Sequence, residues 1–241
     1  MADIDTRYKS LATMRRKPAN NLLTSFEPDS GIHEVGIDEA GRGPLLGRVY
    51  SAAVVLPKDD SFRHEWMKDS KKFTNWEKLQ LTSCYIKEHA IAYSVSYEDE
   101  SSIDSINILQ ATYKSMHKCI YEVTSKLNTR DLHLLVDGSN FKQYIVSDAD
   151  DDFINIPHTC VVSGDNTYSS IAAASILAKV ARDEYINELC NDNPLLDTYY
   201  GISSNKGYGS QQHRDGINAH GISKWHRKSY GICKDHLHRV W

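Results

Sequence analysis

The chain has 241 residues, of which 40% are hydrophobic and 25% are charged, the ordinary composition of a soluble globular protein. No apolar run reaches the roughly 18 residues that a membrane span needs, so we exclude a transmembrane protein and expect no membrane partner. The first residues contain acids where a secretion signal would have a basic head, and the five cysteines lie far apart without a CxxC pair. These features predict an intracellular, reducing, cytoplasmic setting.

Charge is distributed unevenly along the chain, although the net charge is only −4. Residues 199–241 contain seven Lys and Arg against two Asp and Glu, whereas residues 1–198 contain 21 against 30. A basic end beside an acidic body is typical of a metal-dependent enzyme that acts on nucleic acid, and equally of a solvated tail. Composition leaves both interpretations open.

Periodicity and charge divide the chain into three regions: a leader and linker (1–31), a central α/β domain (32–192) and a basic C-terminal helical region (193–241). The leader is expected to hold one short helix near Tyr8 to Arg16. Strands are predicted at 33–38, 48–57, 91–97, 132–138 and 156–165, and helices at 75–89, 106–127 and 167–190. A short turn joins the first two strands, which are therefore expected to pair antiparallel. The pattern predicts an α/β fold with a mixed five-stranded sheet flanked by helices.

Three predicted strands end in carboxylates: Asp38 with Glu39, then Asp137, then Asp165. Ligands of open α/β sheets bind at strand ends, so these acids converge if their strands are neighbours. Four close carboxylates cannot all stay ionised without a compensating cation. The pattern therefore predicts a two-metal site for Mg²⁺ or Mn²⁺, as used in phosphodiester hydrolysis.

A glycine-rich turn, Gly41-Arg42-Gly43, follows the first pair of acids. Glycine lets a backbone approach a ligand closely, and arginine between two glycines can meet a phosphate with a forked contact. The turn predicts a substrate-binding element beside the metal site.

Six segments in the same order resemble the type 2 ribonuclease H (ribonuclease HII) family across roughly residues 33–220. They are GIDEAGRGPLLG, DSKKF, NILQATYKSM, LLVDGSNF, GDNTYSSIAAASILAKVARDEY and NKGYGSQQH. The resemblance implies a ribonuclease H-like fold. It also implies cleavage of RNA–DNA hybrids and of duplex DNA that contains a single ribonucleotide, so these duplexes are the expected partners of a monomeric enzyme.

Carried over by position, the resemblance makes Asp38, Glu39, Asp137 and Asp165 the catalytic, metal-binding acids. It implies that the Gly41-Arg42-Gly43 turn reads the ribose 2′-hydroxyl at an RNA–DNA junction, and that Tyr208 packs on the deoxyribose of the following nucleotide. The 2′-hydroxyl is what distinguishes RNA from DNA, which agrees with such a reader. Cleavage 5′ of the last ribonucleotide, leaving 3′-OH and 5′-phosphate ends, is the expected outcome.

Several other polar residues have a functional and a structural interpretation. Expected phosphate contacts, each weighed against simple solvation, are Lys71, Lys72, Lys206, Ser210 and His213.

Lys179 and Arg182 are expected to bind the surroundings of their own helix. The acidic loop at 147–152 reads as solvated. Cys233, His236 and His238 have zinc-like spacing, but a basic tail is the favoured interpretation.

Two single-residue departures from the family pattern affect flanking geometry: Arg48 replaces the usual proline and Phe73 the usual leucine. The segment VDGSNF also differs from the commoner bacterial form. Two alternatives to the enzyme stay open, a non-catalytic module that binds hybrid duplexes and another two-metal nuclease of the same broad fold. Intact acids argue against the first. The glycine turn and Tyr208 argue against the second, because a DNA-only enzyme needs no ribose reader.

Overall fold

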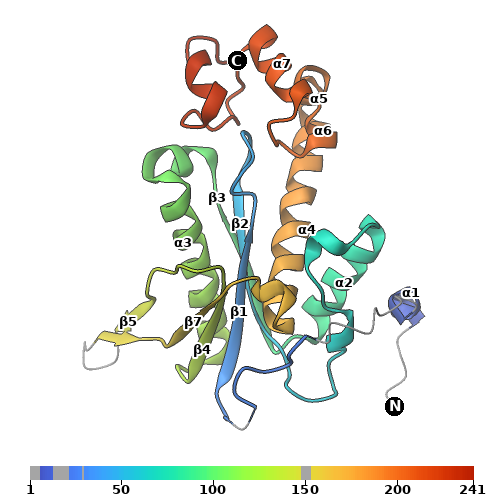
Figure 1. Cartoon of the computed structure of the whole chain (residues 1–241), viewed down its shortest axis with the longest axis vertical. Helices are drawn as coiled ribbons and strands as arrows, with labels where there is room; N and C mark the ends of the chain where they lie inside the picture. The colour runs from blue at the N-terminus through green and yellow to red at the C-terminus, as the bar shows by residue number, and fades with distance from the viewer. Residues whose placement is uncertain (1–5, 13–21, 29, 148–152) are drawn as a thin grey trace.

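The structure is a computed structural model that describes residues 6–12, 22–28, 30–147 and 153–241. Five strands form one sheet in the order β3-β2-β1-β4-β7 (Figure 1). They are β1 (His33–Ala40), β2 (Val49–Val55), β3 (Ala92–Glu98), β4 (Leu132–Asp137) and β7 (His158–Val161). β1 pairs antiparallel with β2 and parallel with β4, so the predicted mixed five-stranded sheet is confirmed.

Helices cover both faces of the sheet. Because successive side chains of a strand point to opposite faces, β2 contributes to two separate cores. Ala52 and Val54 lie in a core with residues of α2 and α4, whereas Ala53 and Val55 lie in a core with residues of α3. Figure 1 shows α3 on one side of the sheet and α4 with α2 on the other. Their bounds are α2 (Trp76–His89), α3 (Glu100–Leu127) and α4 (Ser169–Asp192).

The predicted helix at 106–127 is wrong at its start. The helix begins at Glu100, before the predicted position, and leaves helical geometry at Asn107 (φ 65°, ψ 164°). Ile106 and Leu109 are 36% and 40% exposed, whereas Met116, Ile120 and Val123 are buried. The interruption at Asn107 changes the helical phase, so residues near it do not follow the 3.6-residue period of the rest.

The C-terminal region is ordered and packs at the end of α4, beyond the tips of β1 and β2 (Figure 1). Its elements are α5 (Pro194–Tyr200), α6 (Ile202–Asn205), α7 (Gln211–His220) and the 3₁₀ helix η5 (Gly231–His236). A core of its own includes Tyr200, Ile217 and Cys233 and extends to Leu46 of the β1–β2 loop. The thiol of Cys233 is thus part of this core rather than of an open zinc site.

Two smaller segments complete the described chain. The leader contains η1 (Thr6–Tyr8) and α1 (Lys9–Ala12), while the rest of the predicted helix lies outside the described residues. β5 (Ile145–Ser147) and β6 (Phe153–Asn155) pair in an unpredicted two-stranded sheet, and the acidic loop between them is also outside. The three-region division stays a prediction. Within the described ranges no helix has the length and apolar character of a membrane span.

Candidate active site

Two of the four acids lie side by side on neighbouring parallel strands. β1 and β4 pair with Ile37 opposite Val136, so Asp38 and Asp137 occupy the next position of each strand. Asp38 is only 5% exposed, and its Oδ1 accepts the N–H of Glu39 at 2.7 Å. Ser175 of α4 also donates to Asp38, which ties the acid to the helix behind it.

Asp165 reaches the same place by a different route from the predicted one. β7 ends at Val161, so the prediction of a strand that runs to this acid is wrong. Asp165 lies in the 3₁₀ turn η4 (Gly164–Asn166), which follows Ser163 in the left-handed conformation (φ 55°). The N–H of Gly164 donates to Asp137 Oδ1 at 2.6 Å and fixes this turn to the end of β4.

The four carboxylates are close enough together to interact by charge repulsion. Burial, followed by repulsion from Glu39 and Asp137, holds the pKa of Asp38 well above its usual range. Burial raises the pKa of Glu39 despite the opposing guanidinium of Arg42, and Asp137 adds to the rise. Burial also raises the pKa of Asp165, with Asp137 again contributing. Asp137 therefore interacts with each of the other three.

This donor set fits a divalent metal. Buried carboxylates that repel each other are stabilised by a cation, and oxygen ligands are those that Mg²⁺ and Mn²⁺ prefer. Among the described residues no group of three or more His, Cys, Asp or Glu side chains is close enough to hold a metal ion by itself. A complete cage is not required, because Mg²⁺ is usually bound by one or two carboxylates while it keeps several waters.

A fifth acid, Asp69, was missed by sequence reasoning. It caps η3 (Ser70–Lys72) by accepting the N–H of Lys71 at 2.9 Å, and its carboxyl also lies against Asp165, where it raises the pKa of that acid. The signal was its place at the start of DSKKF, the segment already noted for its lysines. The positive charge of Lys71 interacts electrostatically with both Glu39 and Asp165. The ammonium of Lys72 instead donates to Asn166.

The glycine turn and Tyr208 are neighbours, although 165 positions separate Gly43 from Tyr208 in the sequence. A Cβ added to Gly43 would lie 3.5 Å from Cε1 of Tyr208. Gly41 has φ +94°, and a Cβ there would clash with the Arg182 side chain at 2.4 Å, so glycine is required. Arg42 donates to Glu39 at 3.4 Å and connects the turn to the acids.

The remaining predicted contacts lie close to Tyr208 and differ in accessibility. Lys206 is half-buried, and its ammonium donates to Asn187 at 2.5 Å. Ser210 caps α7 by accepting the N–H of His213 at 3.2 Å. The prediction that His213 contacts phosphate is wrong, because the residue is 0% exposed. Arg182 is buried and donates to the carbonyl of Lys206 at 2.6 Å.

His213 instead belongs to a buried histidine pair behind Tyr208. Its Nδ1 lies 3.0 Å from the carbonyl of Tyr208, and its Nε2 lies 3.0 Å from Nε2 of His226. The N–H of Ser223 donates to Nδ1 of His226 at 2.9 Å, and the ring of Tyr200 packs against the same histidine. Two neutral rings satisfy this chain of donors and acceptors, and a second proton on His226 would break it.

The pair predicts a pH-dependent stability. Burial, with repulsion from His213, lowers the pKa of His226 to about 3. The unfolded chain protonates this histidine near pH 6.5, so below that pH the native state binds fewer protons than the unfolded one. The contribution of neutral His226 to the free energy of unfolding is fully present above pH 6.5. It is lost as the pH falls toward 3, by up to about 1.4 kcal/mol per pH unit.

Urea unfolding between pH 5 and 7.5 measures this slope. We expect His226→Gln to lower stability at pH 7.5 and to flatten the slope between pH 6.5 and 5 relative to the unmodified chain. His220→Gln, at an exposed histidine at the end of α7, is the matched control and should keep the slope. Equal slopes in all three proteins would contradict a neutral buried His226.

The two departures from the family pattern have local explanations. The guanidinium of Arg48 lies 4.1 Å from the ring centre of Tyr97 and 4.3 Å from that of Tyr185. The ring of Phe73 receives the ammonium of Lys68 at 4.1 Å. Both residues are therefore held by cation–aromatic contacts and leave the acids in place.

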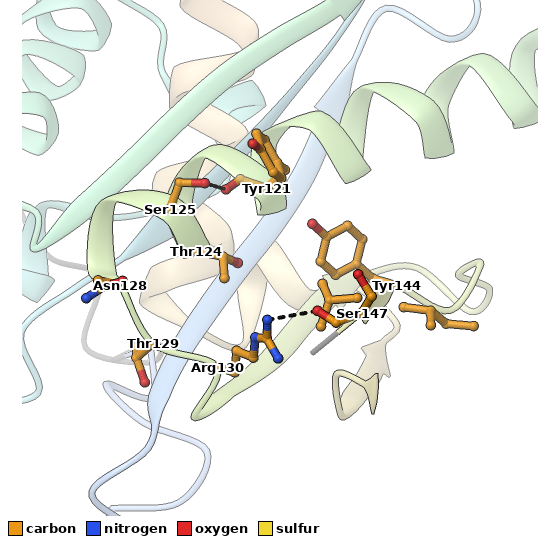
Figure 2. Close-up of a pocket in the computed structure, with 10 residues that line it drawn as sticks. Tyr121, Thr124, Ser125, Asn128, Thr129, Arg130, Tyr144 and Ser147 are labelled. Atoms are coloured by element: carbon orange, nitrogen blue, oxygen red, sulfur yellow. Dashed lines mark hydrogen bonds between the residues drawn. The ribbon is translucent and has the colours of Figure 1, made fainter. Parts of the chain in front are cut away.

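A pocket of about 710 Å³ lies away from these residues, between the end of α3 and the β5 strand (Figure 2). Arg130 donates to the carbonyl of Ser147 at 2.8 Å across it. Tyr121 and Tyr144 line it, and none of the four acids does. The proposed chemistry therefore does not involve this pocket.

A mixed sheet with carboxylates gathered at the ends of its central strands places the chain in the class of ribonuclease H-like α/β enzymes. The family model described as ribonuclease HII matches residues 35–233. The ribonuclease HII of Parabacteroides distasonis is 43% identical over 209 residues, which cover 87% of this chain and 95% of the relative. That of Cytophaga hutchinsonii is 40% identical over 208 residues, covering 86% and 93%.

Solved structures agree on the fold. Ribonuclease H2 from Pyrococcus horikoshii superposes with a TM-score of 0.63 at 20% identity, covering 86% of this chain and 98% of the other. Bst-RNase HIII in complex with Mn²⁺ gives 0.63 at 18% identity, covering 99% and 75%. The chain belongs to the ribonuclease HII family. It is a divalent-metal-dependent endoribonuclease of RNA–DNA hybrids, so the alternative of a non-catalytic module is set aside.

Proposed function

We propose that the enzyme also cuts duplex DNA on the 5′ side of a single embedded ribonucleotide and leaves 3′-OH and 5′-phosphate ends. The observation that carries this proposal is the proximity of Gly43 and Tyr208, since a Cβ added to Gly43 would lie 3.5 Å from the Tyr208 ring. The two glycines of the turn leave its backbone open to close approach by a ribose, and an adjacent aromatic face suits a deoxyribose while crowding an extra hydroxyl. Tyr208 is 50% exposed, which leaves its ring accessible to such a sugar.

Asp38, Glu39, Asp137 and Asp165 are the proposed ligands of two Mg²⁺ or Mn²⁺ ions. When bound, the ions supply an activated water and stabilisation of the leaving oxygen. Burial and mutual repulsion of the acids support this assignment, and the Mn²⁺ complex of Bst-RNase HIII is consistent with it. Asp38 is held by Ser175 and by the N–H of Glu39, so its carboxylate is oriented before metal arrives.

The basic residues around the acids are proposed to hold the substrate backbone. Lys71 lies near both Glu39 and Asp165, a position that suits contact with the scissile phosphate. Lys72 and Lys206 are assigned to flanking phosphates together with Ser210, whose hydroxyl can still donate while its oxygen caps α7. Arg42 is exposed beside Glu39, within reach of the strand that enters the site. One protein molecule acting on one duplex suffices for this arrangement.

End mapping on a labelled duplex tests the proposal. The substrate carries one ribonucleotide in DNA, and the control duplex has the same sequence without it. With Mg²⁺ or Mn²⁺ we expect a single cut 5′ of the ribonucleotide and no cut in the control. Cleavage of a continuous hybrid without cleavage at the single ribonucleotide would overturn the proposed specificity and leave the family's activity intact.

A further inference from the structure

Arg227 lies beneath the glycine turn and is 0% exposed. Its guanidinium donates to four carbonyl oxygens of the β1–β2 loop. These bonds run from Nη2 to Gly41 at 2.6 Å and Arg48 at 3.2 Å, from Nη1 to Arg42 at 3.0 Å, and from Nε to Gly47 at 2.8 Å. Burying a guanidinium is costly, and this one binds neutral carbonyls, so the arrangement stabilises one particular loop geometry at the expense of desolvation.

The direction of these carbonyls fixes the direction of the neighbouring N–H groups. In a trans peptide the C=O and the N–H point to opposite sides. The carbonyls of Gly41 and Arg42 point to Arg227, so the N–H groups of Arg42 and Gly43 point away from it. Both residues are exposed, and within the described chain neither N–H donates a hydrogen bond. Two oriented backbone donors are thus presented beside Tyr208.

A second contact from the same segment supports this orientation. The hydroxyl of Tyr230 donates to the carbonyl of Arg42 at 2.9 Å, and the Arg227 guanidinium lies 5.0 Å from the Tyr230 ring centre. The N–H of Arg227 also donates to the carbonyl of Leu45 at 2.8 Å. The segment 227–230 therefore holds the turn by its carbonyl oxygens, independently of the side chain of Arg42.

We infer that Arg227 is a positioning residue for ribose recognition: it aims the N–H groups of Arg42 and Gly43 at the sugar hydroxyl of the substrate. This inference rests on the proposed role of the turn as a ribose reader. Lysine cannot replace arginine here, because a single ammonium cannot match the planar fork that reaches four carbonyls. Loss of the fork frees the peptides of the turn to rotate and misdirects both donors.

The test compares binding of two labelled duplexes in EDTA, one with a single ribonucleotide and one entirely of DNA. We expect the unmodified protein to prefer the ribonucleotide duplex. In Arg227→Lys the ratio of the two dissociation constants should shrink roughly tenfold, the scale of one or two misplaced hydrogen bonds. Its affinity for the DNA duplex should stay constant, because phosphate contacts are unchanged. A purely structural role would weaken both duplexes equally.

Arg239→Lys is the matched control, since Arg239 also donates to backbone carbonyls, those of Asn218 and Ala219, away from the turn. It should keep the full preference. Absence of any preference in the unmodified protein would overturn the ribose-reader proposal itself. A preference that persists in folded Arg227→Lys would overturn only the role of Arg227. If Arg227→Lys does not fold, Tyr230→Phe decides: a reduced preference supports the inference, and an unchanged one overturns it.

Discussion

Replacing Asp137 with asparagine should reduce turnover by roughly a thousandfold or more, the scale seen when one member of a catalytic set is removed. Asp137 interacts with the other three acids, so its loss removes the carboxylate that they share. Asparagine keeps an oxygen that can accept the N–H of Gly164, so the turn that carries Asp165 should stay in place. Binding of the hybrid duplex should therefore change little.

Single-turnover cleavage, fluorescence anisotropy and thermal melting together check this prediction. In the absence of metal the variant should melt no lower than the unmodified protein, because one repelling charge is gone. Asp131→Asn is the control, at an exposed acid just before the same strand, and it should cleave normally. Cleavage by Asp137→Asn within tenfold of the unmodified enzyme would show that this carboxylate is not required.

Replacing Gly36 with alanine should lower the free energy of unfolding by about 3 kcal/mol or more, because the new methyl group has no space. A Cβ at this position would lie 2.1 Å from the carbonyl carbon of Ser170 and 2.4 Å from the N of Ile171. Both are backbone atoms of α4, which cannot move aside as a flexible side chain would. The contact lies two positions before Asp38, so the surviving folded fraction should also lose activity.

Urea unfolding measures this loss, with Gly31→Ala as the matched control. An added Cβ at Gly31 meets nothing within 4 Å, so this variant should stay within about 0.5 kcal/mol of the unmodified protein. A loss of less than about 1 kcal/mol in Gly36→Ala would mean that β1 and α4 are farther apart than described.

The sheet was predictable because its strands carry strong local signals. The β2 segment is apolar on both faces, and the structure buries all seven of its residues. The short turn after β1 correctly implied an antiparallel neighbour. The acids at 38 and 137 were likewise visible as polar residues that end apolar runs.

Other features depend on contacts that local sequence does not encode. Asp165 looked like a strand end, but a left-handed Ser163 turns the chain before it. His213 looked like a surface residue of a basic region, and only its packing against His226 reveals a buried role. Asp69 was hidden between lysines, and its proximity to Asp165 arises from tertiary folding.

The hydrogen bonds between Arg227 and the glycine turn also have a consequence for the order of folding. Arg227 and Gly41 are 186 positions apart, so the loop between them must close before the turn reaches its final geometry. The pairing of β1 with β2 closes a far shorter loop and can form early. A partly folded chain can therefore assemble its sheet before the turn is fixed. Ordering of the glycine turn is expected to be a late kinetic event, slowed by mutations at Arg227 more than by mutations in the β1–β2 pair.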